Sequence, residues 1–213
     1  MAFDVYERLF DEDGEYEEEA TFRYREELHE LFVASPEGQE LVRQQGIVKG
    51  WADIFMDYGI RYLRRTPAEM SLDEVEEVLF DLFPRKVSAD PESGEEIVHE
   101  LQAFWTFLQR EFHVANADAC LRLLTPATGR RLEKEMQNPR NFDMAKSLVM
   151  LGKARGFDTR SPKGMEAWIN TYNKELSADR TAREADAGSP LPAPGAFWPG
   201  THLPGTHSHR ATK

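Results

Sequence analysis

Two stretches of the chain place a glutamate and a histidine three residues apart, in EELHEL (26–31) and in EIVHEL (96–101). Residues at this spacing share one face of a helix, where they can hold a metal ion together. Two such helices supply half of a di-iron or di-manganese carboxylate site in a helical bundle. Each stretch also begins like the zinc-protease motif H-E-x-x-H. Metal chemistry is therefore the first function that these residue types suggest.

The positions of the two pairs on their helices argue against a metal site. An α-helix turns about 100° per residue, which places both pairs opposite the apolar arcs of their helices. A metal inside a bundle needs ligands that point inward among apolar side chains. The zinc-protease motif also lacks its second histidine in both stretches. We therefore predict no metal and no cofactor, and expect four side chains to be exposed: Glu26, His29, Glu96 and His99.

Other residues that could do chemistry also fit structural roles. Asp53 and Asp57 are four apart and could act as paired carboxylates, but Asp57 and Arg61 have the spacing of an ordinary ion pair on a helix surface. The only cysteine, Cys120, lies in the apolar pattern ADACLRLL and is expected to be buried. No catalytic residue is therefore predicted. This favours a non-enzymatic protein, with an enzyme of scattered site residues as an alternative.

The elements that must position these side chains are all predicted to be helices. No segment alternates apolar and polar residues as a half-buried strand does. A Ser, Thr, Asp or Asn followed by Pro, which caps a helix and presets its first turn, occurs six times within residues 1–178. The sequence predicts an all-α fold, a single irregular bundle of about seven or eight helices over residues 1–178. The helices at 95–112 and 141–155 have the widest apolar arcs and are expected at its centre.

Two helix ends are predicted from local signals. Ser71 and Glu74 form a capping box, and Pro84 is expected to end the helix that they begin. Asn138 with Pro139 is expected to begin the helix that ends before Gly156.

Residues 179–213 differ from the rest of the chain because they are rich in Pro, Gly, Ser and Thr. We predict an unordered or extended tail here. Within it, Phe197 and Trp198 follow a proline-rich stretch that favours an extended conformation. Two large apolar side chains on such a segment are candidates for binding a partner or the parent domain. A tail without a function is an equal alternative.

Charge is spread unevenly along the chain. Residues 1–100 carry 27 acidic and 10 basic side chains, whereas residues 101–213 carry 11 acidic and 16 basic ones. A possible basic patch in the second half would suit a nucleic acid, but the overall net charge of −12 argues against that partner. The residues of this patch are Arg130, Arg131, Lys134, Lys153 and Arg155.

The expected location is the cytoplasm. The first residues resemble no signal peptide, no run of 18 apolar residues occurs, and a single cysteine fits a reducing compartment. No membrane partner is predicted.

Three segments resemble a helical domain of uncharacterised bacterial proteins: VLFDLFPRKVSADPE (78–92), ELQAFWTFLQREF (100–112) and NFDMAKSLVMLGKARGFD (141–158). The resemblance covers about residues 35–176. It implies an all-helical fold in a bacterial protein, and it brings no activity and no site residue with it.

Taken together, these features favour a non-enzymatic interaction or regulatory protein of the bacterial cytoplasm, whose partner is another protein. The acidic first half and the tail aromatics are its candidate surfaces. A nucleic-acid-associated protein is the first alternative, and a metal-binding bundle or an enzyme is the second. The sequence leaves the oligomeric state open.

Overall fold

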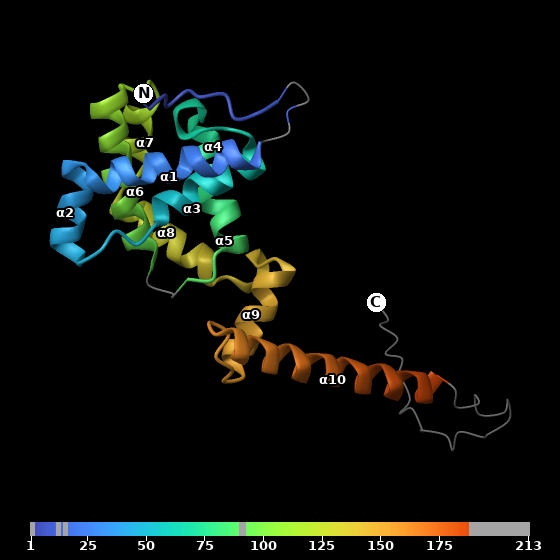
Figure 1. Cartoon of the computed structure of the whole chain (residues 1–213). Helices are drawn as coiled ribbons and strands as arrows, with labels where there is room; N and C mark the ends of the chain where they lie inside the picture. The colour runs from blue at the N-terminus through green and yellow to red at the C-terminus, as the bar shows by residue number, and fades with distance from the viewer. Residues whose placement is uncertain (1–2, 12–13, 15–16, 90–92, 188–213) are drawn as a thin grey trace, which may run out of the picture. The chain divides into compact units, whose positions relative to one another are not determined.

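A computed structural model of the chain describes residues 3–11, 14, 17–89 and 93–187. These residues form helices and loops and contain no strand, which confirms the predicted all-α class. Contacts divide the chain into two units, Met1–Thr159 and Arg160–Lys213. The first unit contains α1 (Glu18–Ala34), α2 (Pro36–Gln45), α3 (Trp51–Tyr58), α4 (Leu72–Glu77), α5 (Phe83–Lys86), α6 (Ser93–Phe112), α7 (Ala117–Leu123), α8 (Pro126–Gln137) and α9 (Met144–Ala154), and the second contains α10 (Pro162–Ala187) (Figure 1).

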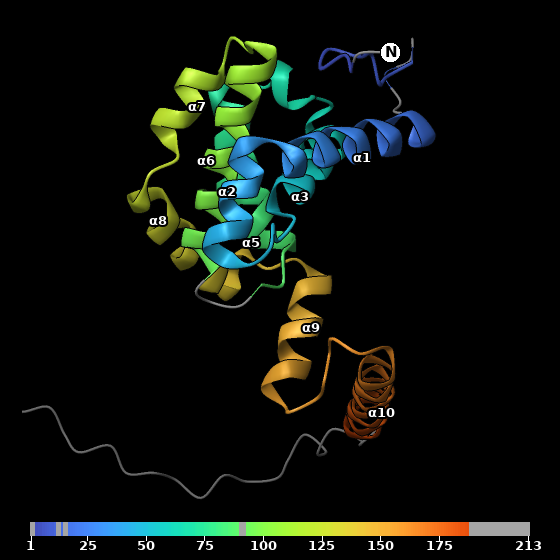
Figure 2. The same ribbon diagram turned by 60° about the vertical axis from the view of Figure 1, so that its left-hand side comes forward.

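The central helix of the first unit is α6, as its apolar arc predicts. Leu101, Phe104 and Trp105 are completely buried, and α2, α3, α7 and α8 pack around the helix (Figures 1 and 2). Aromatic rings fill this core, with Phe32 of α1 in edge contact with Phe104 and Phe55 of α3 in edge contact with Trp105. The position of α6 therefore follows from the size and number of its apolar side chains.

The prediction of a second central helix over residues 141–155 is wrong. Only Lys146 and Gly152 of α9 are buried, and Met144 is 89% exposed. Figure 2 shows α9 extending beyond the ends of α5 and α8 rather than lying alongside α6. An apolar arc shows only that a helix face needs covering; it does not say which part of the molecule covers it.

Several helices begin where the sequence predicts. The Ser35 hydroxyl accepts a hydrogen bond from the Gly38 amide, and Thr125 accepts one from Thr128 in the same way. The capping box of Ser71 and Glu74 also forms, which confirms that prediction. Each cap satisfies an amide that the first turn of a helix leaves without a partner.

The expected start at Asn138 is wrong, because Asn138 caps only a short 3₁₀ turn at Pro139–Asn141. The true N-cap of α9 is Asp143, whose carboxylate accepts from the Lys146 amide at 2.8 Å. A second capping residue five positions later therefore takes over the start of the helix.

Pro84 does not end its helix, contrary to the prediction. The chain stays helical from Leu72 to Lys86, and a π-helical segment, η3 (Val78–Leu82), ends two residues before Pro84. A π segment shifts the pairing from i→i−4 to i→i−5, which accommodates a residue that has no amide hydrogen to donate. A similar π segment, η1 (Gly59–Leu63), continues α3. Joined in this way, the described residues form nine continuous helices.

The first turn of α3 is capped by a residue from another helix. Its N-cap, Gly50, offers no side chain. Instead, the buried carboxylate of Glu100 on α6 accepts hydrogen bonds from the amides of Lys49 (2.8 Å) and Ala52 (2.9 Å). A negative charge at a helix N-terminus also interacts favourably with the helix dipole. Glu100 therefore fixes α3 on α6.

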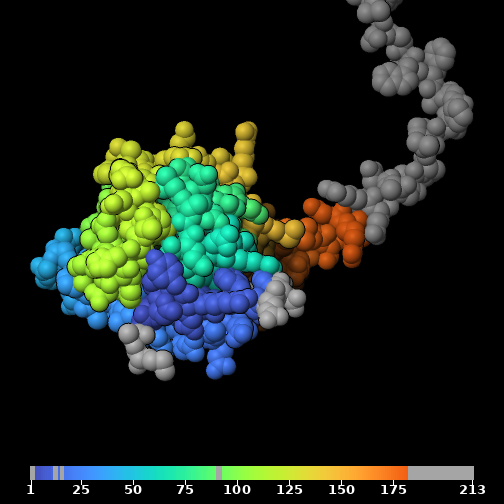
Figure 3. Space-filling view, turned by 90° about the horizontal axis from the view of Figure 1, so that it is seen from above, coloured from blue at the N-terminus to red at the C-terminus, as the bar shows by residue number. Residues whose placement is uncertain are grey.

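The N-terminal segment covers one side of the bundle. Val5 and Leu9 are buried, and the Tyr24 hydroxyl donates a hydrogen bond to the Val5 carbonyl at 2.9 Å. Phe3 packs its ring on Tyr24 and Phe112. Figure 3 shows this segment in dark blue, between the lighter blue of α1 and the teal and yellow-green helices.

In the second unit, α10 continues through position 178, at which the sequence predicts the helical domain to end. Phe197 and Trp198 lie outside the described residues. Within the described part of the chain, no helix has the length and apolar composition that a membrane span requires.

Candidate partner-binding groove

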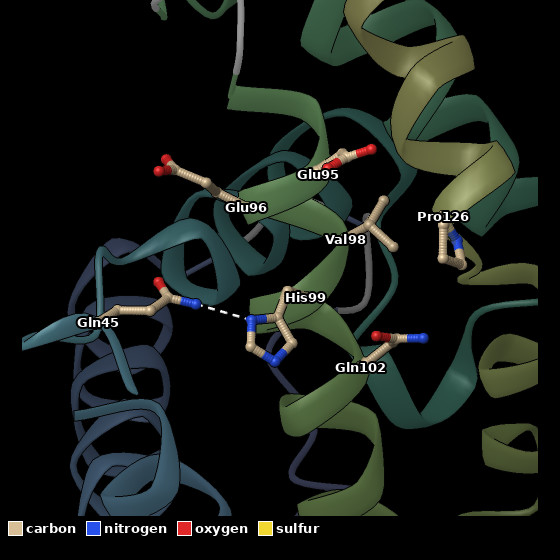
Figure 4. A pocket seen from close by; sticks show the side chains of 7 residues that line it. All are labelled: Gln45, Glu95, Glu96, Val98, His99, Gln102 and Pro126. Atoms are coloured by element: carbon tan, nitrogen blue, oxygen red, sulfur yellow. Dashed lines mark hydrogen bonds between the residues drawn. The ribbon is translucent and has the colours of Figure 1, made fainter. Parts of the chain in front are cut away.

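Glu96 and His99 line a pocket of about 340 Å³ between α2, α6 and the start of α8, together with Gln45, Glu95 and Gln102 (Figure 4). The expectation that both side chains are fully exposed is wrong, because both are half-buried. Packing of α2 against α6 covers this face of α6. Helical phase alone assigns the same face to solvent, since it contains no information about neighbouring helices.

The polar groups of this pocket already have partners. The Gln45 amide donates to His99 Nδ1 at 2.7 Å, which places the proton of a neutral His99 ring on Nε2 (Figure 4). Glu96 pairs with Lys49 at 2.6 Å, and Glu95 lies 3.9 Å from Arg130. The pocket therefore contains no unpaired carboxylate.

The first E-x-x-H pair lies in a different groove, which we call the Arg25 groove. It consists of two hollows that share Arg25 as a wall. The first, of about 300 Å³, lies between α1 and α3 and is lined by Phe22, Arg25, Glu26, His29, Glu30 and Asp53. The second, of about 440 Å³, is lined by Arg25, Trp51, Ile54, Asp57, Tyr58, Lys86, Val87 and Ser88.

Arg25, together with Arg61, neutralises the two aspartates of α3. Its guanidinium contacts both carboxylate oxygens of Asp53, at 2.7 and 3.1 Å, and also pairs with Asp57. Asp57 accepts from Arg61 at 2.7 Å, which confirms the ion pair expected from their spacing. Asp53 and Asp57 therefore bind cations of the protein itself and are not poised as a catalytic acid and base. Arg25 is 28 residues from Asp53, and no local signal marks it as their partner.

Two residues that line the groove each bury a side-chain polar atom without a hydrogen-bond partner in the described structure: His29 Nδ1 and Trp51 Nε1. The His29 side chain as a whole is half-buried, which corrects the prediction that it is exposed. A buried polar atom without a partner costs free energy. His29 lines the first hollow of the Arg25 groove, and Trp51 lines the second.

The rim of the first hollow combines an aromatic ring with unpaired charge. Phe22 is 62% exposed. Glu26 and Glu30 are also exposed, as predicted for Glu26, and neither has an ion-pair partner among the described residues. At the other end of the groove, Lys86 is already engaged, since its ammonium lies 3.3 Å from Asp143 and over the Tyr62 ring. The carboxylates of Glu26 and Glu30 therefore give the first hollow an unpaired negative charge.

The two E-x-x-H pairs do not come together. Within the part of the chain that the structure describes, no three His, Cys, Asp or Glu side chains are close enough to hold a metal ion. Cys120 is buried as predicted, and burial raises the pKa of its thiol to about 12. It therefore acts as a small core side chain and not as a nucleophile.

The residues of the possible basic patch are divided between two helices. Arg130, Arg131 and Lys134 lie exposed on α8, whereas Lys153 is in the last turn of α9 and Arg155 is its C-cap. The Arg131 guanidinium stacks on the Phe80 ring at 3.6 Å. A nucleic-acid surface formed by these residues stays a prediction.

Comparison of the chain with protein-family models, with curated proteins and with solved structures gives no match. A functional assignment therefore depends on the chain's own groups.

Proposed function

We propose that this chain is a non-enzymatic interaction protein of the bacterial cytoplasm that binds another protein through the Arg25 groove. The observation that carries the proposal is the rim of its first hollow, where an exposed Phe22 ring lies beside two unpaired carboxylates, Glu26 and Glu30. Exposed aromatic rings next to a hollow are typical centres of protein interfaces, because burying the ring contributes much of the binding free energy.

The paired state of the other ionisable groups supports binding over catalysis. Asp53 and Asp57 are both paired with Arg25, so neither carboxylate is free to act as a general base. Burial raises the pKa of Tyr58 to about 12, which keeps its hydroxyl protonated at neutral pH. The groove can thus offer a shaped, charged surface to a partner.

The nucleic-acid alternative has less support from the contacts. Arg131 is held on Phe80, Arg130 lies near Glu95, and Lys153 and Arg155 also have interactions within the protein, so four of its five residues already have partners. Phosphate contacts require such side chains to be available.

Capture of the native partner from lysate by the full-length chain tests the proposal. Glu26→Gln with Glu30→Gln removes both rim charges. Asp73→Asn with Glu77→Gln is the matched control, because these α4 carboxylates have the same spacing, are exposed and have no partner among the described residues. We expect a stoichiometric partner that the rim variant loses and the control retains. Equal capture by both variants would remove the groove from the interface.

A further inference from the structure

We propose that the partner contributes an extended segment with a lysine or arginine and a neighbouring apolar side chain, which lies along both hollows of the Arg25 groove. This inference rests on the proposed function and specifies the chemistry of its partner. It follows from two features of the groove: its unpaired charge and the shape of its two aromatic-walled hollows.

The charge of the groove selects a cationic group. Arg25 and Lys86 are each paired with aspartates, whereas Glu26 and Glu30 have no cation. In the pocket of Figure 4, in contrast, Glu95 and Glu96 each have a cationic partner. A lysine or arginine of the partner would find its complement at the rim of the first hollow, beside Phe22.

The shape of the groove suits an extended chain. Arg25 separates two hollows of about 300 and 440 Å³, so the groove has two successive places for side chains. In an extended segment every second side chain points the same way, which allows two of them to enter the hollows on either side of Arg25. The aromatic walls, Phe22 in one hollow and Trp51 with Tyr58 in the other, suit apolar parts of those side chains.

Fluorescence anisotropy with labelled peptides and the full-length chain tests the inference. The probe is a nine-residue peptide of alternating lysine and leucine, and its control has glutamate in place of lysine. We expect saturable binding of the basic peptide alone, weakened about tenfold by Glu26→Gln with Glu30→Gln. The Asp73→Asn, Glu77→Gln control should bind as the wild type does. Excess spermine or Mg²⁺ should compete poorly, because neither carries an apolar side chain for the aromatic walls.

Binding that does not distinguish the two peptides, or that both charge variants weaken equally, would overturn the inference. Complete displacement by low concentrations of spermine would show that the groove selects a free polyamine instead. If the basic peptide does not bind while the rim variant still loses its native partner, the proposed function stands and the extended basic segment is wrong. If neither result is obtained, both fail.

Discussion

At the scale of single residues, the structure depends on polar groups that bridge distant parts of the chain. Glu100 of α6 caps the start of α3. Arg25 of α1 pairs with Asp53 and Asp57 of α3, although their spacing in the sequence does not mark them as partners. The carboxylates of Glu26 and Glu30 differ from these groups, because they have no partner among the described residues. The contrast separates groups that hold the fold from groups that remain available for a partner.

Replacement of Glu100 by glutamine should destabilise the first unit. The glutamine oxygen can accept only one of the two amide hydrogen bonds, and its NH₂ group would face the other amide. We expect the free energy of unfolding to fall by about 2 kcal/mol, measured by urea denaturation. Glu96→Gln on the same helix is the control, since its half-exposed ion pair with Lys49 should contribute less than about 1 kcal/mol. Equal losses would refute a capping role for Glu100.

Lys146 predicts a pH dependence of stability. Its buried ammonium donates to the carbonyls of Pro84 (2.7 Å) and Met136 (3.3 Å), and burial lowers its pKa to about 8, only partly offset by Asp143. The unfolded chain has a lysine pKa near its ordinary value of about 10.4. Between these values the unfolded state binds more protons, so the wild type gains stability as the pH rises from 8 to 10.

The gain should be on the order of 2 kcal/mol relative to Lys146→Met, measured by denaturant unfolding at several pH values. Lys134→Met on the exposed surface of α8 serves as the control and should follow the wild type. A constant difference between wild type and Lys146→Met from pH 7 to 10 would contradict the effect of burial.

At the scale of elements, the crossing of α6 and α8 depends on two glycines. A Cβ atom on Gly94 would lie 2.5 Å from the Gly129 carbonyl oxygen, and one on Gly129 would lie 3.0 Å from the Glu95 Cα. The two backbones therefore approach closely at this point. The α6–α8 contact then positions Glu95 and His99 in the pocket of Figure 4.

Gly94→Ala should destabilise the protein although alanine favours a helix by about 1 kcal/mol. The backbone clash forces α6 and α8 apart, and a shift of this kind costs about 1–3 kcal/mol. We expect a net loss of about 1 kcal/mol by thermal or urea denaturation. A more stable Gly94→Ala protein would show that the crossing adjusts without cost.

The sequence predicts those parts of the fold that depend on local chemistry. The caps at Ser35, Ser71 and Thr125 and the buried face of α6 follow from residue types and periodicity. The sequence does not predict what depends on neighbouring helices. His29 and His99 were assigned to solvent by helical phase, yet other elements half-bury both. Gly50 is a sequence signal for the cap that Glu100 supplies, since a helix start without its own capping side chain needs one from elsewhere.

At the scale of the whole molecule, the first unit is a helical bundle that presents one groove with unpaired acidic and aromatic groups. Phe22 and Leu31 provide an internal comparison, because both are exposed on α1 and lie nine positions apart, on opposite sides of the helix. Only Phe22 lines the Arg25 groove. A partner bound in that groove should therefore contact one of these positions and not the other.

The most direct measurement is site-specific photo-crosslinking in cells, with a photoreactive phenylalanine analogue placed at Phe22 or at Leu31 of the full-length chain. We predict a single adduct from position 22, attached to a lysine- or arginine-containing segment of one partner. The adduct should disappear in the Glu26→Gln, Glu30→Gln background, and none should form from position 31. Equal adducts from both positions, or none from position 22, would contradict binding through the Arg25 groove.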